Sequence, residues 1–218
     1  MKPKQKIALI TGASNGLGLA LAKKLISLSY HVIAIARSKT RLMRLDDYAR
    51  SLGSFITIVP LDLQDTAKIK ELGVLLANKF GQIDLFIPAS AIIYELTPLT
   101  HLADDKWQEI INVNLSANFY LFKILDPLLK NSANAKIIML NDQNANQAYF
   151  NGYGVTKAAL STMANIYAAE VANISNIKLY NYSPPPMNTK LVQNFTPDTT
   201  KYADPAEVAA NIIDQYGL

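Results

Sequence analysis

Six short apolar segments recur along the chain, and segments with helical spacing separate them. The apolar segments are near-continuous rather than alternating, and they lie at residues 6–10, 31–36, 54–60, 83–87, 136–140 and 177–182. Continuous apolar strands are typical of a sheet that is covered on both faces. The intervening segments have apolar residues at helical intervals and span residues 16–29, 39–52, 65–80, about 104–130, 153–173 and 205–216.

This alternation predicts an α/β fold, a single doubly wound, Rossmann-like parallel sheet of about six strands with helices on both faces. Neither an internal repeat nor a low-complexity linker divides the sequence, so we expect residues 1–218 to form one domain. About fourteen residues separate Thr189 from the last helical segment. We therefore expect no seventh strand.

The amino-acid composition excludes several kinds of catalytic and metal-binding site. The sequence contains no cysteine, which excludes disulfides, thiolate catalysis and cysteine-ligated metals and predicts a reducing, cytoplasmic location. The two histidines, His31 and His101, have no carboxylate at ligand spacing, so we expect no metal site. The first apolar segment is too short for a signal peptide or a membrane span, and we expect no membrane association.

Positive charge is concentrated near the start of the chain. The net charge is +4, and residues 1–45 carry nine Lys or Arg and no Asp or Glu. A basic patch can bind nucleic acid, form a local phosphate site, or simply be solvated. Because no nucleic-acid motif or interleaved aromatic residues accompany it, we expect no nucleic-acid partner.

A glycine-rich loop, TGASNGLG at residues 11–18, connects the first predicted strand to the first predicted helix. Gly12 suits a tight turn, Gly16 lets the backbone approach a pyrophosphate, and Gly18 allows close packing of the helix on the sheet. The helix N-terminus then offers N–H groups and a positive dipole end to phosphates. We predict a dinucleotide site that also includes the remaining loop residues Ser14, Asn15 and Leu17.

The end of the second predicted strand indicates which dinucleotide binds. No acidic residue precedes Asp46, so the carboxylate that holds the ribose of NAD is missing, whereas Arg37 and Ser38 directly follow the strand. An arginine there accommodates a 2′-phosphate. NADP(H) is therefore the preferred cofactor and NAD(H) a possible one. The alternative is that Arg37 only solvates the start of the next helix.

Asp62, at the end of the third predicted strand, has two interpretations. Its carboxylate either accepts a hydrogen bond from the adenine amino group or, together with Asp65, caps the following helix.

An ordered set of motifs completes the pattern: TGASNGLG at 11–18, LDL at 61–63, INVNLSANF at 111–119, YGVTK at 153–157 and PPPMNT at 184–189. With them the chain resembles the short-chain dehydrogenase/reductase family from residue 5 to about residue 190. The resemblance implies one NAD(P)-binding domain. It also adds Leu63, Ala89, Ser90, Pro186, Met187 and Thr189 to the predicted cofactor-binding residues.

The resemblance assigns catalysis to Tyr153 and Lys157. Four residues apart on a helix, they share one face, so the ammonium favours the ionised phenol and lowers its pKa. Tyr153 would give its proton to a carbonyl oxygen as hydride reaches the carbon, and Lys157 would also bond the nicotinamide ribose. Asn114 would hold a water molecule in the proton relay. The alternative for Asn114 is a helix residue that faces solvent.

Several positions depart from the family pattern. No serine stands between residues 137 and 153, where the family has a hydrogen-bond donor to the reacting oxygen, and Asn141 or Asp142 takes its place. An Asn amide can donate to this oxygen, whereas an ionised Asp repels a developing alkoxide. The strand-end asparagines are replaced by PASA at 88–91, and the usual Pro-Gly is Pro184-Pro185.

Two functions follow from these patterns. The first is an NADP(H)-dependent oxidoreductase of the short-chain type, which acts on a small carbonyl or secondary alcohol. The alternative is a dinucleotide-binding protein with weak or no turnover that senses redox state or acts through a partner. The apolar faces of the helices at 104–130 and 153–173 predict a homodimer, unless they only cover the sheet.

Overall fold

The computed structural model describes residues 5–193, 196 and 201–218. Within them, six parallel strands form one sheet in the order β3-β2-β1-β4-β5-β6. The strands are β1 (Ile7–Thr11), β2 (His31–Ala36), β3 (Thr57–Pro60), β4 (Leu85–Pro88), β5 (Lys136–Leu140) and β6 (Lys178–Tyr182). This is the doubly wound α/β architecture that the sequence predicts.

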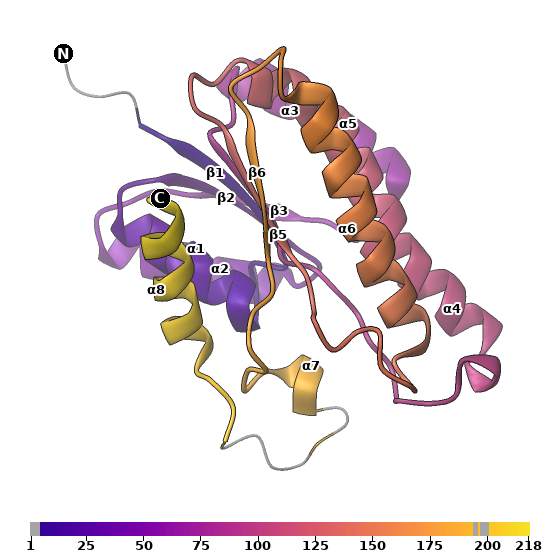
Figure 1. Ribbon diagram of the computed structural model, residues 1–218. Helices are drawn as coiled ribbons and strands as arrows, with labels where there is room; N and C mark the ends of the chain where they lie inside the picture. Colours follow the sequence, from indigo (N-terminus) through magenta and orange to yellow (C-terminus); the bar gives the residue numbers. More distant parts are fainter. Residues whose placement is uncertain (1–4, 194–195, 197–200) are drawn as a thin grey trace.

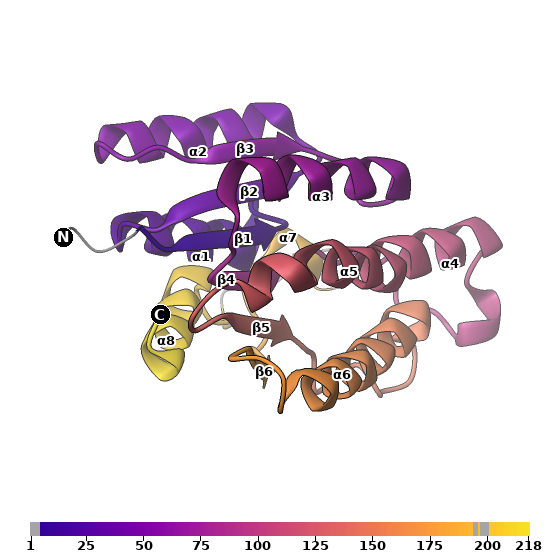
Figure 2. The same ribbon diagram turned by 90° about the horizontal axis from the view of Figure 1, so that it is seen from above.

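Helices cover both faces of the sheet (Figures 1 and 2). One face carries α1 (Gly16–Ser27), α2 (Lys39–Ser51) and α8 (Pro205–Tyr216). The other carries α3 (Thr66–Phe80), α5 (Ala117–Lys130) and α6 (Asn151–Val171), with α4 (Asp104–Ile110) continuing the line of α5. The shorter helices are η1 (Leu99–His101), η2 (Ile111–Ser116) and α7 (Lys190–Gln193).

Alternate residues of the strands enter two separate hydrophobic cores. On β1, Ile7 and Leu9 pack with α3, α5 and α6, whereas Ala8 and Ile10 pack with α1, α2 and α8. Successive strand side chains point to opposite faces, so a strand covered on both sides must be apolar throughout. This explains the continuous apolar segments of the sequence.

The predicted helix at 104–130 differs from the structure in its middle. A π-helical turn, η2, separates α4 from α5, and the chain continues through it without a break in helical backbone. A π-turn widens the helix by one residue and is frequent at functional sites. Asn114 lies in this turn.

The strand order reverses between β1 and β4, which are neighbours in the sheet although β2 and β3 separate them in the sequence. In an open parallel sheet, ligands bind beyond the carboxyl ends of the strands at such a switch point. Among the described residues, none of the helices combines the length and the apolar character that a membrane span needs.

Candidate functional site

A cleft of about 780 Å³ opens at the carboxyl ends of the strands. The loops after β1, β2, β4, β5 and β6 all contribute to its lining. Every residue predicted to bind the cofactor lines this cleft: Gly12, Ser14, Asn15, Gly16, Leu17, Gly18, Arg37, Ser38, Asp62, Leu63, Ala89, Ser90, Tyr153, Lys157, Pro186, Met187 and Thr189. Asn141 and Asp142 line it as well, whereas Asn114 does not.

The glycine loop has a backbone that side chains would obstruct. Gly12 has φ +66°, and a Cβ atom there would stand 2.8 Å from the Ala89 carbonyl oxygen. A Cβ atom on Gly18 would stand 2.5 Å from the Gly12 carbonyl oxygen. The N-cap residue of α1, Asn15, makes no side-chain hydrogen bond to the helix. The loop therefore directs N–H groups of the first turn toward the cleft without a side-chain cap.

Basic side chains line the cleft at the end of β2. Arg37 is exposed, Arg41 follows on α2, and neither takes part in an ion pair within the described residues. The Ser38 hydroxyl accepts a hydrogen bond from the Arg41 N–H at 3.4 Å and caps α2. Ser38 thus has a structural role in addition to its place in the cleft, and the helix start does not require Arg37 as a cap.

The two carboxylates considered for capping α3 have different roles. Asp65 is the N-cap, and its Oδ1 accepts from the Lys68 N–H at 3.0 Å. Asp62 Oδ1 accepts instead from the Gln64 N–H at 3.0 Å, in a local turn, and its side chain lines the cleft. Asp62 is therefore not the cap of α3 and stays available to the cleft.

Tyr153 and Lys157 are buried on the first turns of α6. Lys157 Nζ donates to the Leu140 carbonyl at 2.6 Å and lies 5.6 Å from the centre of the Tyr153 ring. Burial lowers the pKa of Lys157 to about 8. The pKa of Tyr153 is raised, first by burial and then by the charge and hydrogen bond of Asp142. The expected lowering of the Tyr153 pKa by Lys157 is therefore wrong for this structure.

Asp142, rather than Asn141, contacts the tyrosine. Tyr153 Oη donates to Asp142 Oδ2 at 3.0 Å. Asn141 Nδ2 donates to Asn181 Oδ1 at 3.0 Å, so this amide is engaged with the neighbouring strand β6. Of these two residues, Asp142 has the direct contact with the phenol.

Asn114 is fully buried, which rules out the solvent-facing interpretation. Its Nδ2 donates to the Ile92 carbonyl at 2.9 Å and to Thr156 Oγ1 at 3.2 Å, and its Oδ1 accepts from the Ile92 N–H at 2.8 Å. The Asn114 backbone carbonyl accepts from Asn118 Nδ2 at 2.7 Å. Asn114 therefore fixes the loop after β4 from behind the cleft.

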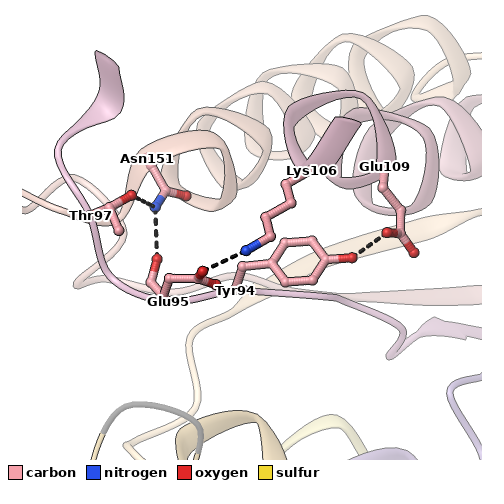
Figure 3. Close-up of polar contacts among 6 residues, drawn as sticks. All are labelled: Tyr94, Glu95, Thr97, Lys106, Glu109 and Asn151. Carbon is pink, nitrogen blue, oxygen red and sulfur yellow. Dashed lines mark hydrogen bonds and ion pairs between the residues drawn. The ribbon is translucent and has the colours of Figure 1, made fainter. Parts of the chain in front are cut away.

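The same loop is fixed further along by α4 and α6 (Figure 3). The Tyr94 hydroxyl donates to Glu109, and Lys106 Nζ pairs with Glu95 Oε1 at 2.5 Å. Asn151 Nδ2 donates to the Glu95 carbonyl at 3.1 Å. These contacts hold a loop that lacks the asparagine side chains of the family pattern.

Sequence reasoning missed other residues of the cleft. They are mostly apolar or amide side chains that the reasoning did not single out, although Leu61, Ala91 and Val113 lie within quoted motifs: Ala36, Leu61, Ala91, Ile92, Ile93, Val113, Leu140, Asn144, Gln147, Phe150, Leu191, Val192 and Tyr202. Gly154 does not line the cleft, but as a glycine in a helix it marks a close approach of two backbone segments. A Cβ atom on Gly154 would stand 2.1 Å from the Ala145 carbonyl oxygen. In the described part of the chain, no group of three acidic or histidine side chains is placed to hold a metal ion.

Comparisons with known proteins agree with this geometry. A family model described as short chain dehydrogenase matches residues 6–200. The 3-oxoacyl-(acyl-carrier-protein) reductase FabG of Salmonella typhimurium is 31% identical over 173 residues, which cover 77% of this chain and 68% of that protein. An uncharacterized oxidoreductase of Staphylococcus aureus strain N315 is 24% identical over 210 residues, which cover 95% of this chain and 89% of that protein.

Solved structures share the fold. A short chain dehydrogenase structure from Pseudomonas syringae has a TM-score of 0.90 and 26% identity, and the match covers 97% of this chain and 87% of that chain. One from Shigella flexneri, complexed with NADP, has a TM-score of 0.89 and 22% identity over 97% of this chain and 89% of that chain. Since the family model spans most of the sequence, the chain belongs to the short chain dehydrogenase family, a family of oxidoreductases.

Proposed function

We propose that the protein is an NADP(H)-dependent oxidoreductase that transfers hydride between the nicotinamide and a small carbonyl or secondary alcohol. The observation that carries this proposal is the continuity of one cleft. It has the glycine loop and Arg37 toward one side and the buried pair Tyr153 and Lys157 toward the other. A single extended ligand with phosphates and a reactive ring fits such a cleft.

The residues present fit a dinucleotide phosphate. Glycines at positions 12 and 18 leave space that a Cβ atom would fill, and the start of α1 has no side-chain cap. Arg37 and Arg41 supply charge where a 2′-phosphate of NADP would lie, and the cleft has no carboxylate directly after β2. The structure from Shigella flexneri that shares this fold is complexed with NADP, which supports a nicotinamide dinucleotide as the ligand of the cleft.

When bound, the nicotinamide supplies or accepts hydride, and side chains of the protein donate or accept the proton. Tyr153 places a hydroxyl in the cleft, where it is hydrogen-bonded to Asp142, and it is the group proposed to donate a proton to the substrate oxygen. Lys157 stands beside the Tyr153 ring, and burial lowers the pKa of its ammonium to about 8. We assign Tyr153 as the acid/base and Lys157 as its electrostatic partner.

One observation favours the alternative, a dinucleotide-binding protein with weak turnover. Burial, and then the charge and hydrogen bond of Asp142, raise the pKa of the Tyr153 phenol, which opposes proton transfer to a neutral substrate. A bound nucleotide without efficient turnover would then serve as a redox signal.

Kinetics with matched variants separate the two functions. Turnover of a panel of small aldehydes, ketones and secondary alcohols is followed by NADPH absorbance for the wild-type protein, Tyr153→Phe and Tyr149→Phe. Tyr149 is an exposed tyrosine that does not line the cleft, so its variant controls for the loss of a hydroxyl. We expect turnover that Tyr153→Phe abolishes and Tyr149→Phe retains. NADPH binding without turnover of any member would favour the alternative, and full activity of Tyr153→Phe would contradict the assignment.

We also propose a homodimer that acts in the cytoplasm. Phe119 on α5 and Val155 and Ile166 on α6 are exposed, and burying such side chains at a helical interface is favourable. Light scattering after size-exclusion chromatography tests the dimer, which Ile166→Lys is expected to dissociate. The absence of cysteine from the sequence supports a reducing compartment.

A further inference from the structure

The Asp142 carboxylate faces the cleft without a cationic side chain in contact. Its Oδ2 accepts from Tyr153 Oη at 3.0 Å, and its Oδ1 accepts from the Asn144 N–H at 2.9 Å. None of the ion pairs in the described residues includes Asp142. The nearby ammonium of Lys157 donates to the Leu140 carbonyl at 2.6 Å, and it interacts with Asp142 through its charge without an ion-pair contact. A half-buried negative charge thus lines the cleft beside the proton donor.

The wall of the cleft near this carboxylate is partly apolar, with the amide side chains Asn141, Asn144 and Gln147 also in the lining. Ile93, Ala145 and Tyr153 form a small hydrophobic cluster, and Phe150 and Leu191 pack against it. Apolar walls exclude water, and a charge in such surroundings interacts more strongly with an opposite charge than it does in bulk solvent. A ligand cation that enters here gains an interaction that a neutral ligand of the same shape lacks.

An ionised carboxylate also has the wrong chemistry for a neutral carbonyl. It only accepts hydrogen bonds, so it has nothing to donate to the oxygen of the substrate. It also repels the negative charge that develops on that oxygen during reduction. An N–H group of a cationic nitrogen donates to the carboxylate and compensates its charge. Binding of such a group releases the Tyr153 hydroxyl from Asp142, so that the hydroxyl can donate to the substrate.

We infer that the preferred substrates of this site carry a cationic nitrogen at, or directly next to, the reacting carbon, and that Asp142 holds this nitrogen. The inference rests on the proposed function and specifies its substrate class. Two kinds of compound present this chemistry: an α-aminoketone, whose ammonium is adjacent to the carbonyl, and an iminium ion. The 3.0 Å separation of Tyr153 Oη and Asp142 Oδ2 suits two heteroatoms on neighbouring atoms of one substrate.

Both reductions balance with the groups present. Reduction of an α-aminoketone takes up one hydride at carbon and one proton at oxygen, and Tyr153 gives that proton and regains one from solvent. Reduction of an iminium ion takes up one hydride at carbon, and the C=N bonding pair becomes the lone pair of a neutral amine. Reduced nicotinamide, as in the proposed function, is the hydride source in both cases.

Binding of unreactive probes tests the inference without turnover. Isothermal titration calorimetry at pH 7 compares benzylamine, which is cationic, with benzyl alcohol, which is neutral, on the free chain and on the chain with NADP⁺. The wild-type protein is expected to bind benzylamine about tenfold more tightly, which is typical of a hydrogen bond to a charged group. Asp142→Asn, which keeps the shape and removes the charge, is expected to abolish this preference. Asp214→Asn on the exposed side of α8 is the matched control and is expected to retain it.

The same titrations distinguish the possible failures. Equal affinity for the two probes in the wild-type protein, or a preference that Asp142→Asn retains, would overturn the inference and leave the proposed function standing. Failure of NADP⁺ to bind would refute the proposed function. The affinities of benzylamine and benzyl alcohol could still be compared on the free chain, which tests the inference separately.

Turnover then identifies the source of the cation. With NADPH, the α-aminoketone 2-amino-1-phenylethanone is compared with acetophenone, and 3,4-dihydroisoquinoline with 1-tetralone. We expect at least one nitrogen compound to exceed its neutral counterpart in kcat/KM by about tenfold, and Asp142→Ser to reverse that order. Faster reduction of both neutral ketones by the wild-type protein would contradict the inference.

Discussion

Both halves of the Asn114 side-chain amide are bound to one backbone residue, Ile92. Nδ2 donates to the Ile92 carbonyl at 2.9 Å and Oδ1 accepts from the Ile92 N–H at 2.8 Å. The π-helical turn at Ile111–Ser116 carries this amide, and the loop after β4 lines the cleft. The helix therefore determines where this wall of the site lies.

Asn114→Ala is expected to destabilise the fold by about 2–4 kcal/mol, because it leaves buried groups of Ile92 and Thr156 without their partner. Urea unfolding measures this loss. Asn112→Ala, on the same turn but hydrogen-bonded to Gln108 at the surface, is the control and is expected to cost about 0.5 kcal/mol or less. Equal losses in the two variants would show that the Ile92 contacts do not contribute.

Gly154→Ala is expected to displace the loop that carries Asp142. A Cβ atom at this position would stand 2.1 Å from the Ala145 carbonyl oxygen, so the loop or the helix must shift. Overpacking of this kind costs about 1–3 kcal/mol. Thermal unfolding measures the loss, and hydrogen exchange locates it at residues 142–147. The variant Thr162→Ser, at an exposed position of the same helix, is expected to leave both measurements unchanged. Hydrogen exchange at the wild-type rate at residues 142–147 of Gly154→Ala would contradict the close approach of Gly154 to the Ala145 carbonyl.

Lys157 gives the stability a pH dependence of known sign. Its folded-state pKa of about 8 lies below the unfolded value of 10.5, because burial disfavours the charged form. Between these values the unfolded chain binds more protons than the folded chain, so stability rises with pH across this window. Lys157→Met lacks this contribution. We expect the wild-type protein to gain about 1 kcal/mol per pH unit relative to Lys157→Met between pH 8 and pH 10.

Urea unfolding at pH 7, 8, 9 and 10 measures this difference. The series ends at pH 10 because the raised pKa of Tyr153 acts in the opposite sense above its ordinary value of 10. There the unfolded tyrosine loses its proton while the folded one retains it, which lowers stability. Parallel curves for the two proteins would show that Lys157 has an ordinary pKa in the fold.

The fold could be predicted from the sequence because the local hydrophobic pattern and the tertiary packing indicate the same structure. Continuous apolar strands such as residues 31–36 require cover on both faces, and the glycines at 12 and 18 require close backbone approach. The part of the cleft proposed to bind the cofactor could be predicted from the same signals, because its residues lie in the loops that leave the strands.

The catalytic half was less predictable, because it depends on contacts between distant segments. Spacing placed Tyr153 and Lys157 on one helix face, but the pKa of Tyr153 depends on burial and on the direction of the Asp142 carboxylate. The role of Asn114 likewise depends on a π-turn, which apolar spacing does not reveal. Tertiary packing, rather than local sequence, decides these features.

Arg37 is expected to decide between NADPH and NADH. Arg37→Ala removes an exposed guanidinium that lines the cleft directly after β2, where no carboxylate stands. We expect the loss of a charge-assisted phosphate contact to weaken the binding of NADPH by about tenfold and to leave the binding of NADH nearly unchanged. Lys190→Ala, which removes a cation that does not line the cleft, is the control and keeps the wild-type ratio. If Arg37→Ala keeps the wild-type ratio of NADPH to NADH affinity, the Arg37 side chain is only solvated and does not contact the cofactor.

Binding of a pyridine dinucleotide in the cleft at the carboxyl ends of the strands underlies every proposal above. Titration of NADPH fluorescence with the purified wild-type chain tests it most directly, with NADH titrated in parallel. We expect saturable binding of one NADPH per chain with weaker binding of NADH. An unchanged fluorescence and no measurable binding of either nucleotide would contradict it.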